Sequence, residues 1–181
     1  MTPEEQAKYI GLLIDAERQY KLAIAVSAAR RSSKDNVFNY LSMFTYGRHG
    51  ATHDELYLNP EQEKRAASAL EHCAINLMAV QIDTVLSHVV SDRFNHSDTS
   101  ICSASWIARL IRNAFAHNPL NPIWLTYSEC DNREFTVTNI IRLHTTGLHS
   151  KRLNRRDYGG PLSLLRLSEF VRATVSSITT T

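Results

Sequence analysis

Arg112, Asn113 and His117 are the residues of this chain whose types and spacing could do chemistry. They lie in residues 106–119, where apolar side chains recur at helical spacing and predict a buried helix. Histidine exchanges protons near neutral pH, and arginine binds a phosphate through two parallel N–H donors. The pair therefore suits RNA cleavage without a metal, in which the 2′-hydroxyl attacks its own phosphate.

The predicted helix leaves the relation between these side chains open. Asn118-Pro119 predicts its end, since a residue before proline avoids the α conformation, so we expect His117 in the last turn. Arg112 and His117 would then lie about 140° apart around the helix, whereas Asn113 and His117 share a face. Either Arg112 reaches around, or the helix ends before His117, or the two residues cooperate between subunits. The alternative to catalysis is a structural network that ties the helix end to the fold.

The string Arg112-Asn113-Ala114-Phe115-Ala116-His117, followed by Asn118-Pro119, resembles the signature of the HEPN superfamily. That signature is an arginine, a polar residue and a histidine a few residues further on, at the end of a helix. The resemblance covers roughly residues 3–119. It implies a mainly α fold, a HEPN-like bundle of four to five helices, and a homodimer in which two motifs form one cleft.

For nuclease members of that superfamily, the resemblance implies a metal-independent endoribonuclease of the toxin or defence type. Arg112 would hold the scissile phosphate, His117 would transfer a proton, and Asn113 would contact a phosphate oxygen or orient the histidine. The alternative is a non-catalytic HEPN interaction module that binds RNA, a nucleotide or a protein partner such as a cognate antitoxin.

A basic stretch favours a polyanionic partner. Residues 142–172 hold seven Lys or Arg against two acidic residues, and such a cluster attracts RNA without sequence specificity. A solvated loop with no partner is the alternative. The predicted RNA-binding residues are Arg109, Lys151, Arg152, Arg155 and Arg156.

Composition is that of an ordinary globular domain. The 181 residues are 43% hydrophobic and 21% charged, with a formal net charge of +2. We expect a cytoplasmic protein, because no secretory signal and no membrane-spanning apolar run is present. Three distant cysteines and scattered histidines predict neither a disulfide framework nor a metal site, and no cofactor is expected. We expect reduced cysteines, two of them in helical cores.

The remaining elements follow from periodicity and turn residues. Helices are predicted over residues 3–29, 37–46, 61–91 and 162–178, and a β-hairpin is predicted from residues 123–127 and 135–141. Ser100 or Ser103 is expected to cap the helix that carries the motif. Asp83 and His88 interrupt an apolar helix, and their roles stay open. We expect one domain, with a helical core in residues 1–119 and a hairpin, basic loop and closing helix in residues 120–181.

Overall fold

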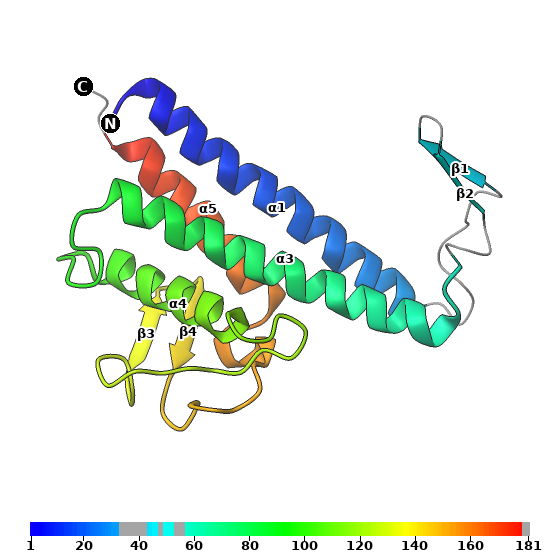
Figure 1. Cartoon of the computed structure of the whole chain (residues 1–181). Coiled ribbons are helices and arrows are strands. Elements are labelled where there is room, and N and C mark those ends of the chain that lie inside the picture. Colours follow the sequence, from blue (N-terminus) through cyan, green and yellow to red (C-terminus); the bar gives the residue numbers. More distant parts are fainter. Residues whose placement is uncertain (33–42, 47–48, 53–56, 179–181) are drawn as a thin grey trace.

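The computed structural model describes residues 1–32, 43–46, 49–52 and 57–178 (Figure 1). In these residues there are four α-helices, namely α1 (Pro3–Ser32), α3 (Pro60–Val89), α4 (Thr99–Phe115) and α5 (Pro161–Ser177). Strands β1 (Met43–Tyr46) and β2 (His49–Thr52) pair, as do β3 (Glu134–Val137) and β4 (Ile141–His144). A 3₁₀ turn, η1 (Arg155–Tyr158), precedes α5. The predicted mainly α bundle with a small hairpin near the C-terminal end is confirmed.

Helix α3 lies at the centre of the bundle. It contacts α1 and α5 on one side and α4 on the other, and the β3–β4 hairpin lies against α4 (Figure 1). The chain after α4 therefore returns to the N-terminal helix through α5, which packs on both α1 and α3.

Side chains at the helix starts satisfy the free N–H groups there. Asn59 caps α3 by accepting from the N–H groups of Glu61 and Gln62, while the Gln62 side chain accepts from the Asn59 N–H. The cap of α4 is Asp98, which accepts from the Ser100 N–H at 2.8 Å. The prediction of a serine cap was wrong, because the helix begins at Thr99, before either serine could serve.

The core is built from one face of each helix. Residues that are at most 2% exposed come from α1 (Leu13, Tyr20), α3 (Ile75, Met78, Ile82), α4 (Ile107, Leu110, Ile111, Phe115) and α5 (Leu164, Leu167, Val171). Trp124 is also completely buried, and its indole N–H donates to Asp157 of η1 at 2.7 Å. Burial of each such side chain contributes about 1.5–3 kcal/mol, so the bundle has a continuous apolar centre.

The predicted hairpin is displaced along the chain. Residues 123–127 do not pair with residues 135–141; instead β3 pairs with β4, with Phe135 opposite Leu143 and Val137 opposite Ile141. The intervening turn contains Asn139 at φ 61°, a conformation that asparagine tolerates better than most residues. These four apolar residues face the core, which fixes the register.

Two other sequence predictions need correction. Residues 43–46, which were predicted to end a short helix, form a strand, and the rest of that predicted helix lies outside the described residues. The cysteines are free, but the buried one is Cys130 in a turn, whereas Cys73 on α3 is exposed and Cys102 on α4 is half-buried. A short apolar segment without strong caps cannot be assigned to helix or strand from periodicity alone.

Candidate functional site

The helix that carries the motif ends before His117. Its last residue is Phe115, and the Ala116 N–H donates to the Asn113 carbonyl at 3.1 Å. Asn118 then forms a turn, because its side-chain oxygen accepts from the N–H groups of Leu120 and Asn121. The expectation that His117 lies in the last helical turn was therefore wrong, and the histidine stands on the connection that follows α4.

Arg112 is held by a buried carboxylate. Its guanidinium lies 2.8 Å from Asp83 on α3, whose other oxygen is 2.8 Å from Arg93. The Asp83 side chain is only 5% exposed, whereas that of Arg112 is 51% exposed. Two arginines therefore neutralise one buried charge, as burial of a carboxylate requires. This gives Asp83 a role that sequence could not assign.

The other two motif residues point to different surroundings. Asn113 donates to the hydroxyl of Tyr127 at 3.1 Å, and His117 is exposed. In the part of the chain that the structure describes, His117 forms no hydrogen bond or ion pair, and no such contact joins it to Arg112 or Asn113. The three residues lie on one stretch of chain, but one subunit does not assemble them into a bonded cluster.

The basic segment meets the chain just after the motif. The Ile123 N–H donates to the Ala114 carbonyl at 3.1 Å, and the Trp124 N–H donates to the Lys151 carbonyl at 2.8 Å. Ile123 also forms an isolated antiparallel bridge with Arg152. These backbone contacts bring Lys151 and Arg152, both exposed, to the end of α4. They also explain why residues 123–127, although β-prone, are not a strand of the hairpin.

His72 of α3 belongs to the same region. Its ring lies edge-on to Phe115, with the ring centroids 6.1 Å apart. Partial burial and the nearby positive charge of Arg152 lower the pKa of His72 from its ordinary value of 6.5. We call His72, His117, Lys151 and Arg152 the α4 end face. His72 had no sequence signal, because its neighbours come from distant segments.

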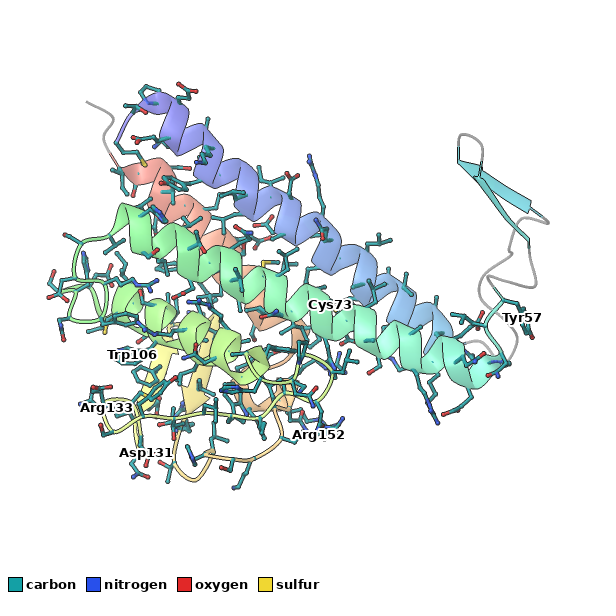
Figure 2. All side chains as sticks on the ribbon, in the orientation of Figure 1. Tyr57, Cys73, Trp106, Asp131, Arg133 and Arg152 are labelled. Atoms are coloured by element: carbon teal, nitrogen blue, oxygen red, sulfur yellow. The ribbon has the colours of Figure 1, made fainter. Side chains whose placement is uncertain are left out.

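The other predicted RNA-binding residues are distributed differently. Arg155 forms an ion pair with the buried Glu71 of α3, while Arg156 is exposed and has no ion-pair partner among the described residues. Arg109 lies over the Phe94 ring at 5.0 Å, beside a separate surface pocket. Figure 2 shows Arg152 well away from Trp106 and Arg133, which line that pocket. The structure thus places Lys151 and Arg152 at the end of α4 and separates them from Arg109.

The pocket contains residues that sequence analysis did not identify. Phe94, Trp106, Tyr127, Glu129 and Arg133 line it together with Arg109. The spacing of Trp106, Arg109 and Asn113 places them on one face of a helix, which was the available signal. Nothing local marks Phe94 or Arg133, since they reach the pocket through the connections on either side of α4.

His88, whose role was open, is an exposed helix residue with local contacts. Its ring nitrogen lies 2.8 Å from the Thr84 carbonyl one turn earlier, and its ring packs 5.5 Å from that of Tyr9. Within the described residues, no three His, Cys, Asp or Glu side chains are grouped so that they could hold a metal ion. None of the helices described is long and apolar enough to cross a membrane.

Comparison of the chain with protein-family models, curated proteins and solved structures gave no match. The resemblance to the HEPN superfamily therefore stays a prediction that depends on residues 112–119.

Proposed function

We propose that this protein binds single-stranded RNA on the α4 end face. The observation that carries the proposal is the set of backbone contacts that hold Lys151 and Arg152 at the end of the helix bearing Arg112, Asn113 and His117. Residues selected on two separate grounds, His117 from the motif and Lys151 and Arg152 from the charge cluster, therefore lie at the same end of α4. Lys151 and Arg152 have no ion-pair partner among the described residues, so their charges are available to phosphates.

Ion pairs within the chain neutralise part of the predicted basic cluster. Arg142, Arg155 and Arg172 each form an ion pair with an acidic side chain, respectively Glu134, Glu71 and Glu17. The remaining unpaired charge is concentrated at Lys151, Arg152 and Arg156 and, on α5, at Arg166. This supports a localised contact with RNA in place of a broad electrostatic surface.

The affinity for a single-stranded RNA, measured against salt concentration, tests the proposal. In the Lys151→Ala/Arg152→Ala variant we expect weaker binding and a log–log salt slope that is shallower by about 0.7 for each lost phosphate contact. The matched control is Lys8→Ala/Lys21→Ala, which removes the same charge from exposed positions on α1. Equal affinities for the two double variants would contradict the proposal.

Metal-independent cleavage by the motif residues is a second candidate. His117 is exposed and unbonded among the described residues, so it is free to exchange a proton with a bound ribose or phosphate. Arg112 is anchored by Asp83 yet 51% exposed, so it could offer its remaining donors to a phosphate oxygen. The HEPN resemblance implies the same roles for the two residues.

Incubation of RNA with the purified protein in EDTA tests this second candidate. We expect cleavage by the wild type and a loss of about 10²-fold or more in the His117→Ala and Arg112→Ala variants. His117→Ala is the cleaner variant, because that side chain supports no described contact, whereas Arg112→Ala also disturbs Asp83. Cleavage that EDTA abolishes, or that both variants retain, would exclude this mechanism.

A further inference from the structure

A pocket of about 710 Å³ opens beside the middle of α4, apart from the α4 end face. It lies between the connection that precedes α4, the exposed face of the helix and the turn at residues 127–133. Its volume is in the range of roughly 300–1,000 Å³ that small-molecule and cofactor sites occupy. Trp106 and Arg133 lie on the same side of the molecule in Figure 2.

One wall of this pocket is aromatic. The rings of Phe94 and Trp106 lie 4.6 Å apart between centroids, and Trp106 is stacked on the buried Phe135 at 5.7 Å. The guanidinium groups of Arg93 and Arg109 lie over the Phe94 ring at 4.6 and 5.0 Å. Arg93 is in turn fixed by Asp83. The wall is therefore held in place by its neighbours, and aromatic and guanidinium surfaces of this kind accept a stacked base.

The charged groups of the pocket are unpaired. Arg109, Glu129 and Arg133 are exposed, and none of them forms an ion pair with any described residue. This contrasts with Arg93, Arg112, Arg142, Arg155 and Arg172, each of which has an acidic partner. Both signs of charge thus border one pocket without neutralising each other. A ligand that carries an anionic group and a hydrogen-bond donor edge would satisfy both.

We propose that this pocket binds a guanine nucleotide, supplied by one residue of the single-stranded RNA. The base stacks on the Phe94–Trp106 wall, and Arg109 and Arg133 hold the phosphate. The Glu129 carboxylate accepts hydrogen bonds only, and guanine presents two adjacent N–H donors on its pairing edge. Adenine, uracil and cytosine each offer one such donor group beside an acceptor, so the carboxylate selects guanine.

The pocket is connected to the face proposed to bind RNA. Tyr127, which lines it, accepts the hydrogen bond from Asn113, and Asn113 follows Arg109 by about one turn of α4. A strand whose phosphates lie on the α4 end face, and which continues along α4 past Asn113, can therefore place a base further along the strand in the pocket. In this respect the inference rests on the proposed RNA binding, but the pocket can also be tested without RNA.

Isothermal titration with guanosine, adenosine, cytidine and uridine 5′-monophosphates, and with inorganic phosphate, tests the pocket. For the wild type we expect saturable binding of the guanosine nucleotide, about tenfold or more tighter than that of the other three. Arg133→Ala should weaken all four by about tenfold. Glu129→Gln should remove the guanine preference and keep nucleotide binding. Lys8→Ala on α1 is the charge control, and thermal melting verifies that each variant is folded.

The two proposals fail separately. If the RNA affinity depends on Lys151 and Arg152 while no nucleotide binds at millimolar concentration, the pocket inference is overturned and the α4 end face stands. If the guanosine nucleotide binds and Arg133→Ala weakens it, but RNA does not bind, the pocket takes a free nucleotide and the proposed function is wrong. Equal binding of all four nucleotides and phosphate would overturn the base-recognition role of Glu129.

Discussion

Asp83 determines how Arg112 is presented at the surface. Because its carboxylate is 5% exposed and lies 2.8 Å from both Arg93 and Arg112, it neutralises charges from two segments at once. Asp83→Asn should lower the free energy of unfolding by about 3 kcal/mol, since two guanidinium groups lose a buried counter-charge. Chemical denaturation measures this change.

The control for this prediction is Asp15→Asn. That carboxylate pairs with Arg18 at 3.0 Å but is 68% exposed, so its loss should cost less than about 1 kcal/mol. Similar small losses in both variants would mean that the Asp83 network adds little to stability, and that Arg112 depends on it only weakly.

His72 gives the stability a predictable dependence on pH. Its folded pKa is lowered below 6.5 by partial burial and Arg152, so at intermediate pH the unfolded chain binds more protons. The free energy of unfolding should therefore decrease as the pH falls through about 6.5 and stop changing below the folded pKa. The slope should stay well under the limit of about 1.4 kcal/mol per pH unit for one proton, because solvent screens the half-exposed ring.

Urea denaturation between pH 5 and pH 8 measures this slope. His72→Gln should flatten it, because the group whose pKa is lowered on folding is then absent. If the free energy of unfolding of the His72→Gln variant kept the same dependence on pH, another titratable group would be its cause.

At the scale of elements, the start of α3 depends on one side chain. Asn59 accepts from the Glu61 and Gln62 N–H groups at 3.1 and 3.0 Å, so Asn59→Ala leaves two donors without their partner. We expect a loss of about 1 kcal/mol, which lowers Tm by about 2–4 °C in a domain of this size. Thermal melting followed by circular dichroism measures the shift. Asn59→Asp keeps the acceptor and should restore most of the stability; an equal loss in both variants would contradict the capping role.

The four helices of the described chain were predictable because periodicity and capping residues act locally. The predicted bounds of the first, third and closing helices lie close to those of α1, α3 and α5. The strands were harder to predict, because a strand can pair with a segment that is distant in sequence. Residues 123–124 pair with residues 150–153, and the turn at Asn139 interrupts what looks like one continuous strand.

Only the part of the candidate site that lies on one stretch of sequence was predictable. Arg112, Asn113 and His117 could be selected from type and spacing, but their partners Asp83 and Tyr127 are distant in sequence. The meeting of Lys151 and Arg152 with the end of α4 follows from backbone pairing that no local pattern encodes. Whether His117 lay inside the helix depended on the Asn118 turn, which ends the helix two residues earlier than proline alone suggested.

At the scale of the whole molecule, a homodimer remains a prediction. Besides the HEPN resemblance, the polar stripe of Arg109, Arg112 and Asn113 on the motif helix favours a dimer, if an interface satisfies these side chains. Asp83 and Tyr127 already satisfy Arg112 and Asn113 within one chain, so the prediction now depends on Arg109 and on the HEPN resemblance. Sedimentation at micromolar concentration should give twice the 20.5 kDa of one chain.

Two substitutions that each introduce an acidic side chain locate the interface of such a dimer. Arg109→Glu should weaken a dimer that forms through the motif helix. Leu22→Asp, on an exposed apolar position of α1, is the comparison, since Leu22 is 63% exposed and lies near Leu70 and Cys73 of α3. A mass of one chain for the wild type would refute the dimer, and a dimer sensitive only to Leu22→Asp would move the interface to α1 and α3.

The two tryptophans of the chain have contrasting environments, which makes the protein its own optical reporter. Trp124 is fully buried and donates to Asp157, so its emission should be blue-shifted and inaccessible to iodide until the bundle unfolds. Trp106 is half-buried at the mouth of a pocket, so its emission should be redder and open to the quencher. Replacing one tryptophan at a time with phenylalanine would separate the two signals. Ligand occupancy and loss of tertiary structure could then be followed independently in one cuvette, without an attached dye.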